Sequence, residues 1–212
     1  MLSQHEDNMP RKKETPELDP REKPGLDANE ILGHEFDYIA NSAFQANEDR
    51  SKAASFFLVS VGSLIATIFG SQEITKPISK EFYLLLAGLF LVITFLGWLT
   101  LAQLIRLRSA WVDAAKAMNK IKDYYASRLN NDLEEAFHWK LNTLPRKFKV
   151  TSIAFYTAVE VAILSATTFG AGIFFLIISL VEAPQNTWAL TITAGLAMFL
   201  LQILSYGIAL RK

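Results

Sequence analysis

Four long runs without a charged residue constrain the fold of this chain more than any other feature. Each run is at least 20 residues long and consists mainly of apolar residues. A bilayer core about 30 Å thick is crossed by a helix of about 20 residues, and soluble domains seldom carry such runs. The runs cover residues 53–72, 82–105, 161–181 and 187–210. We therefore predict an all-α fold, a four-transmembrane-helix bundle, although the zero net charge alone would also fit a soluble domain.

The distribution of Lys and Arg predicts the orientation of these spans. Of the 21 basic residues, 19 precede the first run, lie between the second and third runs, or follow the fourth. Basic residues beside membrane spans stay preferentially in the cytoplasm. We predict a multi-pass protein of the cell inner membrane with both termini and the central loop in the cytoplasm. The outer turns, 73–81 and 182–186, are too short for a folded domain.

The polar segments predict the organisation of the chain. Residues 1–26 hold four of the seven prolines and many charges, which is typical of a disordered cytoplasmic tail. Such a tail is either a flexible leader or a docking segment for a partner. Residues 27–105 are predicted to form a stalk helix plus the first transmembrane hairpin. Asp27 and Glu30 have the spacing of a capping box, which predicts the start of this helix.

Residues 106–149 are predicted to form a cytoplasmic helical loop, and residues 150–212 the second transmembrane hairpin. Apolar residues continue past the second run in alternating three- and four-residue steps, as in a coiled coil. These residues are Leu104, Leu107, Trp111, Ala114, Met118, Ile121, Tyr125 and Leu129. A second amphipathic helix is expected from Asp132, and Pro145 suits the first turn of the helix that enters the third run. The expected result is a set of cytoplasmic helical stalk extensions packed under the membrane.

Glu160 is the one charged residue between Val150 and Val181, which makes it a candidate intramembrane polar site. A carboxylate at the bilayer centre costs about 2.5–3.5 kcal/mol on insertion scales and usually marks an ion or proton path. Counting back from Val181 places Glu160 at the cytoplasmic boundary instead. An approximate internal repeat aligns Glu160 with Ser60, inside the first span. Both depths remain open at this point.

Small residues recur at four-residue spacing in two of the spans. Such stripes let helix backbones approach closely, either within one chain or between subunits. The candidate helix-packing residues are Gly62, Ala66 and Gly70 in the first span, and Ala154, Ala158, Ala162, Ala166 and Gly170 in and before the third.

A charged cluster lies directly before the first span. Glu48, Asp49, Arg50 and Lys52 either form local ion pairs on a solvated turn or line a cytoplasmic vestibule at the mouth of an oligomeric pore. Cysteine is absent, and the three histidines lack the spacing of metal ligands. No phosphate-cradling glycine loop or nucleophile motif occurs. We therefore expect no enzymatic activity, no cofactor, no metal and no nucleic acid binding.

The order of elements over residues 28–130 is a polar amphipathic helix ending at 45–52, a span, a short outer turn, a second span and a cytoplasmic helix. This layout resembles the SLATT-like small bacterial membrane effector family of anti-phage defence and conflict systems. That family has two spans per module, whereas this chain has four. The resemblance implies a homo-oligomer that permeabilises the inner membrane when a cytoplasmic partner or nucleotide signal arrives. Two alternatives are a membrane scaffold or accessory subunit that anchors a cytoplasmic protein partner, and a small ion channel or transporter that uses Glu160.

Overall fold

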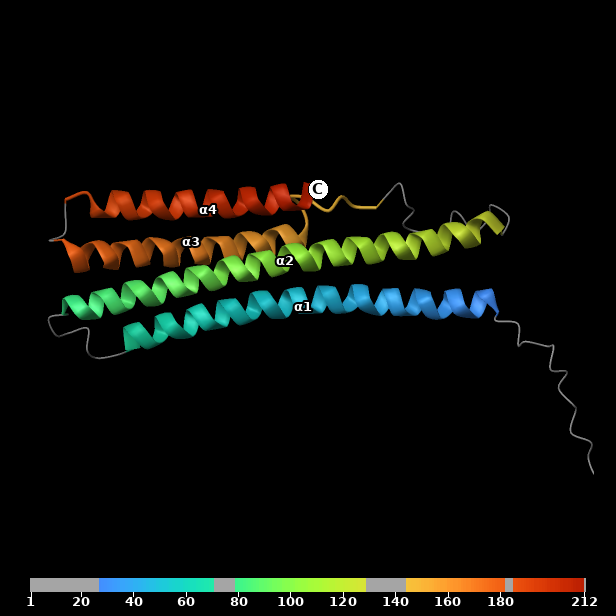
Figure 1. The fold of residues 1–212 in the computed structure, drawn as a ribbon, viewed down its shortest axis with the longest axis horizontal. Helices are drawn as coiled ribbons and strands as arrows, with labels where there is room; N and C mark the ends of the chain where they lie inside the picture. The colour runs from blue at the N-terminus through green and yellow to red at the C-terminus, as the bar shows by residue number, and fades with distance from the viewer. Residues whose placement is uncertain (1–26, 71–78, 129–143, 182–184, 212) are drawn as a thin grey trace, which may run out of the picture.

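The computed structural model describes residues 27–70, 79–128, 144–181 and 185–211, and it is helical (Figure 1). Its helices are α1 (Ala28–Gly70), α2 (Lys80–Arg128), α3 (Ile153–Leu180) and α4 (Thr187–Arg211). These described parts contain no strand. All four helices are long and apolar enough to cross a membrane, by length and composition. The predicted all-α fold with four candidate spans is confirmed.

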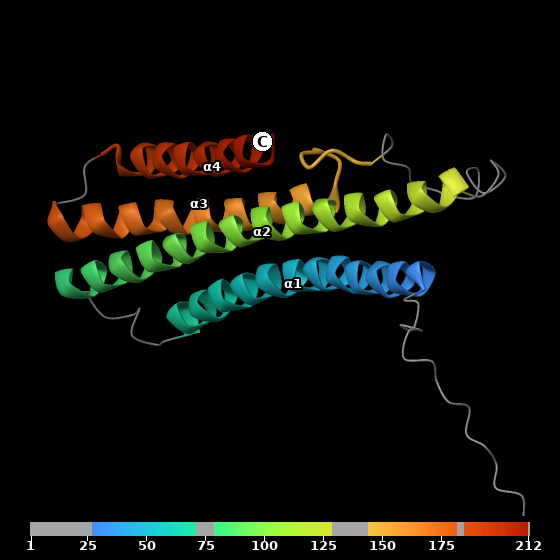
Figure 2. The same ribbon diagram turned by 45° about the vertical axis from the view of Figure 1, so that its right-hand side comes forward.

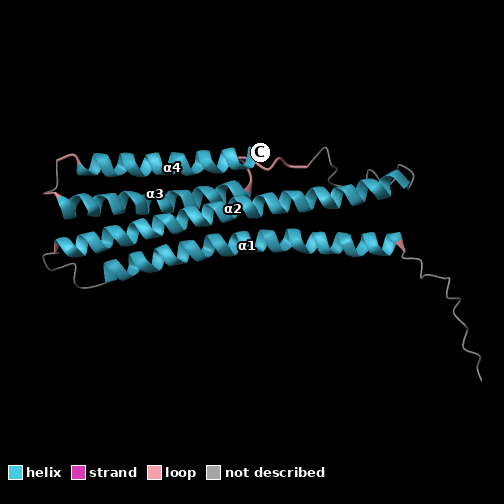
Figure 3. Ribbon diagram, viewed as in Figure 1, coloured by secondary structure: helices cyan, strands magenta, loops and turns pink. Residues whose placement is uncertain are grey.

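The helices α2 and α3 form the centre of the bundle, with α1 against α2 and α4 against α3 (Figures 1 and 2). The first two helices, of 43 and 49 residues, run well past the ends of the other two (Figure 3). At the far end of this extension the Tyr125 hydroxyl donates to the Asn29 carbonyl at 3.3 Å. The α1–α2 extension, residues 28–52 and 106–128, is therefore a pair of packed helices.

Short polar side chains define where two of the helices begin. Asp27 Oδ1 accepts from the backbone N–H of Asn29 at 2.9 Å, so α1 starts directly after the predicted cap. At α3, Ser152 has extended backbone angles and its hydroxyl accepts from Phe155 N at 3.2 Å. Each cap satisfies a backbone N–H that the first helical turn leaves without an internal partner.

The prediction that Pro145 lies in the first turn of α3 is wrong, because that helix begins only at Ile153. Residues 144–152 are irregular and pass beside α2 at Arg108. Arg108 holds them there: its Nε donates to the Lys147 carbonyl at 3.1 Å and its Nη2 to the Arg146 carbonyl at 3.3 Å. An arginine of α2 thus replaces the backbone partners that a helix would supply.

The buried face of the α2 extension also differs from the predicted seam by about one position. The stripe starts at Leu104 as predicted but then leaves the expected residues Leu107, Ala114 and Met118. The buried residues are Leu104, Arg108, Val112, Ala115, Asn119 and Ile121, so the buried stripe meets the prediction again at Ile121. Two of these six are polar, so hydrophobic spacing alone misses the middle of the buried face. The predicted tail, 1–26, and the helix expected from Asp132 lie outside the described residues.

The core draws side chains from all four helices. Its buried members are Phe57, Val61, Phe90, Ile93, Leu101, Leu104, Ala158, Val161, Tyr206 and Leu210. Tyr206 is 2% exposed, and its hydroxyl donates to the Ala154 carbonyl at 3.2 Å, which ties the end of α4 to the start of α3. This core fixes the helices around the polar groups described next.

Candidate functional site

A buried cluster of uncharged polar side chains joins three helices near the middle of α3. Gln202 Nε2 donates to Ser165 Oγ at 2.7 Å, and Ser165 Oγ donates to the Thr94 carbonyl at 3.2 Å. The hydroxyls of Thr94 and Thr168 lie 3.1 Å apart. Hydrogen bonds of this kind between membrane helices are worth about 0.6 kcal/mol on average. The cluster therefore connects α2, α3 and α4, and none of its members is ionisable.

One end of the Gln202 amide lacks a partner inside this cluster. The side chain is fully buried, and its Oε1 accepts no hydrogen bond from the described residues. Exchanging the amide nitrogen and oxygen would leave the nitrogen unpaired instead, since Ser165 Oγ is the single neighbour. An unpaired buried polar atom costs about 1–3 kcal/mol. The cluster contributes helix contacts but contains no acid, base or nucleophile pair.

The central helices approach most closely at Gly97 of α2. A Cβ atom at this position would lie 2.6 Å from both Cβ and Oγ of Ser165 and 3.0 Å from the ring of Phe57. Real Cβ atoms do not come this near to other atoms. The absence of a side chain at Gly97 is thus what lets Ser165 reach the α2 backbone. Sequence reasoning missed Gly97 because it belongs to no stripe of small residues.

The two predicted stripes of small residues have different surroundings. In α3, Ala154, Ala158, Ala162 and Ala166 are buried, and a Cβ at Gly170 would lie 3.2 Å from the Thr191 carbonyl of α4. This stripe packs within the chain.

The predicted stripe of small residues in α1 does not pack against another helix of the chain. Gly62, Ala66 and Gly70 are exposed, and Cβ atoms built at the two glycines meet no described atom within 4 Å. The α1 stripe is therefore not a packing face within this chain, because Phe57 and Val61, on another face of the helix, make its contacts with the core.

Glu160 lies on the outside of the bundle. It is exposed, and its neighbours one turn before and after, Tyr156 and Ile163, are 57% and 51% exposed. It is seven residues into α3, about 10 Å along the helix from Ile153. The carboxylate is therefore separate from the Gln202 cluster in the interior.

The residues of the predicted vestibule divide into two groups. Lys52 Nζ lies 2.8 Å from Glu48 Oε1, an ion pair on the exposed face of α1, whereas Asp49 and Arg50 are half-buried. Arg50 hydrogen-bonds Asn47 one turn earlier. Burial lowers the pKa of Arg50 from its usual value, while the phenol of Tyr206 opposes this shift.

Arg50 and Arg108 together line a pocket of about 340 Å³, here called the arginine pocket. It lies where α1, α2 and the start of α3 meet. Arg108 is 6% exposed and packs over the Trp111 ring at 4.9 Å. Burial also lowers the pKa of the Arg108 guanidinium. The other lining residues are Ala43, Phe44, Asn47, Trp111, Ser152, Ile153 and Ala154.

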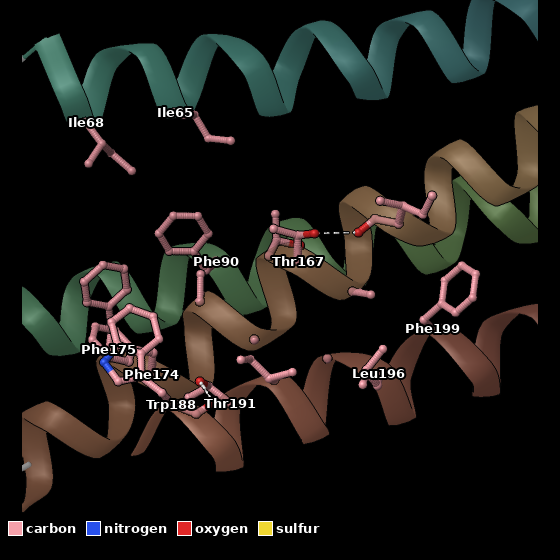
Figure 4. A pocket seen from close by; sticks show the side chains of 17 residues that line it. Ile65, Ile68, Phe90, Thr167, Phe174, Phe175, Trp188, Thr191, Leu196 and Phe199 are labelled. Atoms are coloured by element: carbon pink, nitrogen blue, oxygen red, sulfur yellow. Dashed lines mark hydrogen bonds between the residues drawn. The ribbon is translucent and has the colours of Figure 1, made fainter. Parts of the chain in front are cut away.

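A larger cleft of about 840 Å³ lies among the spans toward the other end of the bundle (Figure 4). Its walls are mainly aromatic and aliphatic, with Phe90, Phe174 and Trp188 among them. The threonine hydroxyls that line it donate to carbonyls of their own helices, as Thr167 does to Ile163 at 2.9 Å. The cleft offers a mainly hydrocarbon environment, and its threonine hydroxyls are already used within their own helices.

In the described ranges, no group of three or more His, Asp or Glu residues is placed to hold a metal ion. Comparison with known proteins gives no match to a family model, to a curated protein or to a solved structure.

Proposed function

We propose that this chain is a non-enzymatic multi-pass membrane protein that assembles into homo-oligomers in the inner membrane and alters its permeability in a bacterial defence or conflict system. The observation that carries this proposal is the outward face of α1. Gly62, Ser63, Ala66, Thr67 and Gly70 are all exposed there, so over residues 62–70 the face is small and bears hydroxyls, whereas Phe56 and Val59 are exposed one to two turns before it.

The exposed face of α4 provides an internal comparison. It presents large apolar side chains, including Leu196, Leu200 and Leu204, each more than half exposed. Hydrocarbon chains suit that surface. A face of Gly, Ala, Ser and Thr instead favours close contact with another helix, because small residues let backbones approach. The contrast supports α1 as the contact between copies and α4 as a lipid-facing helix.

The α1–α2 extension supports a role in receiving a signal. On the predicted topology it projects into the cytoplasm, where a partner can reach it. Both helices continue from the extension into the spans without a break. A contact made on the extension therefore acts directly on the helices that would form the oligomer.

Matched alanine substitutions test the proposal. Ala66 on α1 and Ala197 on α4 are both exposed alanines within predicted spans. Ala66→Leu should lower the fraction of oligomers in lipid nanodiscs several-fold and abolish depolarisation of cells that express the protein, whereas Ala197→Leu should change neither. Subunits are counted by single-molecule photobleaching, and the membrane potential is followed with a dye. Monomeric wild-type protein, or polarised cells even with the neighbouring genes co-expressed, would contradict the proposal.

A second candidate is a membrane scaffold that anchors a cytoplasmic protein. It is favoured by Tyr38 and Phe44, which are 68% and 70% exposed on the part of α1 outside the predicted span. Exposed aromatic residues are frequent anchors in protein interfaces. If Tyr38→Ser and Phe44→Ser release a co-purifying protein but leave the membrane potential of expressing cells unchanged, the scaffold replaces the effector.

A further inference from the structure

We propose that the arginine pocket binds the phosphate group of an anionic ligand at the membrane boundary. The argument rests on Arg50 and Arg108, which line one pocket although they are 58 positions apart in the sequence. Two guanidinium groups facing one cavity repel each other unless an anion lies between them. Guanidinium groups also match the geometry of phosphate oxygens, to which they can donate two parallel hydrogen bonds.

The protein itself supplies no anion to this pocket among the residues that the structure describes. Neither arginine has a carboxylate within ion-pair distance there, and the pocket lining contains no Asp or Glu. The nearby acidic groups have other partners: Glu48 pairs with Lys52 at 2.8 Å and Asp113 with Lys147 at 3.6 Å. Asp49 neighbours Arg50 in the sequence but does not line the pocket.

Both arginines keep donors for a ligand. An arginine carries five N–H donors. Arg108 uses Nε and Nη2 on the carbonyls of Lys147 and Arg146, which fixes the guanidinium in place. Arg50 uses Nη2 on the side chain of Asn47. The ligand would therefore meet two positioned cations whose remaining N–H groups have no described acceptor.

The start of α3 adds to the attraction for an anion. Ser152, Ile153 and Ala154 line the same pocket, and they are the cap and the first two residues of that helix. The N-terminus of a helix carries a partial positive charge and unpaired backbone N–H groups. This contribution alone would not define a site, but here it coincides with the two arginines.

The rim of the pocket and its position in the fold indicate where the ligand lies. Phe44 and Ile153 are 70% and 76% exposed at the rim, and Trp111 forms a wall. Arg50 precedes the first apolar run by three residues, and Arg108 follows the second by three. On the predicted topology this is the depth of lipid headgroups on the cytoplasmic face. The phosphate can belong to a lipid headgroup or to a soluble ligand that enters from the cytoplasm.

The test measures phosphate binding by the full chain in detergent. Native mass spectrometry compares retention of phosphatidylglycerol with that of diacylglycerol, which lacks the phosphate group, and thermal unfolding is followed with and without inorganic phosphate. Wild-type protein should retain phosphatidylglycerol at least tenfold more strongly than diacylglycerol if the source is lipid. If the source is soluble, inorganic phosphate should raise the unfolding temperature.

Two substitutions locate the effect. Arg50→Gln should weaken the phosphate-dependent binding roughly tenfold or more, because a charge-assisted contact is lost. Arg106→Gln is the matched control: it removes an equal charge from the exposed side of α2, two residues before Arg108 and outside the pocket. Equal losses in both variants would overturn the proposal, since the effect would then be diffuse charge attraction. Equal retention of the two lipids by wild-type protein, together with no response to inorganic phosphate, would overturn it without reliance on any variant.

Discussion

Gly97→Ala should push the two central helices apart and destabilise the bundle. The added Cβ would lie 2.6 Å from Cβ and Oγ of Ser165, and an ordinary contact begins at 3.4 Å. Ser165 Cβ is bonded to the backbone, so a change of rotamer cannot relieve the overlap and α3 itself must move. Overpacking of this kind costs about 1–3 kcal/mol.

Two further contributions to the change in the free energy of unfolding of Gly97→Ala nearly cancel. Displacement of Ser165 would weaken its bonds to Gln202 and to the Thr94 carbonyl, at about 0.6 kcal/mol each. Replacing glycine by alanine within a helix favours folding by about 1 kcal/mol. The expected net loss in the free energy of unfolding is about 1–3 kcal/mol. Gly88→Ala is the control, because a Cβ at Gly88 meets nothing within 4 Å. It should be neutral or slightly stabilising.

The assay is unfolding in mixed micelles by increasing SDS, followed by the fluorescence of Trp98 after the other three tryptophans are replaced by Phe. Trp98 Nε1 donates to Met198 Sδ at 3.4 Å, so its emission reports the contact between α2 and α4. The double variant Gly97→Ala/Ser165→Gly removes the atoms in conflict. It should be at least about 1 kcal/mol more stable than the sum of the single effects, since residues in contact are not additive. Additive effects, or equal stability of Gly97→Ala and Gly88→Ala, would refute the close approach.

Two further predictions concern polar groups of the spans. Ser165→Ala should lower the free energy of unfolding by about 1–2 kcal/mol, because the buried Gln202 amide loses its one partner. Gln202→Leu should leave the stability unchanged or raise it, because it removes the unpaired atom; the same SDS titration measures both variants, and a more stable Ser165→Ala than Gln202→Leu would contradict the described network. Glu160→Gln should leave cation and proton flux in protein-containing liposomes unchanged, because the carboxylate faces outward; loss of flux would return Glu160 to an ion path.

The four candidate spans follow from the sequence because length and apolarity alone mark the segments that are able to cross a bilayer. The start of α1 also follows, since a local cap sets it. The buried face of the α2 extension does not. It contains Arg108 and Asn119, whose burial depends on carbonyls and side chains distant in the sequence. The start of α3 is missed for the same reason, because Arg108 holds residues 144–152 outside a helix.

Among the candidate site residues, too, the sequence predicts some features correctly and misses those that depend on distant parts of the chain. The α3 stripe packs inside because helices lie on both sides of it, while the identical spacing in α1 faces outward at the edge of the bundle. The four-residue spacing shows that one face of a helix carries small residues, but the position of the neighbouring helices determines whether that face is packed within the chain. The sequence points to one of the two cations of the arginine pocket, because Arg50 belongs to the predicted vestibule. Its second cation lies 58 positions away, and no local pattern connects the two.

The unbroken passage of α2 from span to extension has a mechanical consequence. Residues 98–128 contain neither Gly nor Pro, so the helix has no residue that favours a hinge where the predicted span passes into the extension. From Ile105 to Arg128 it extends about 35 Å at the usual rise. A push of about 6 Å at its tip therefore corresponds to a tilt of about 10° of the whole rod. The α2 part of the extension is thus a stiff rod, and a displacement at its end would be passed along the helix to the predicted span.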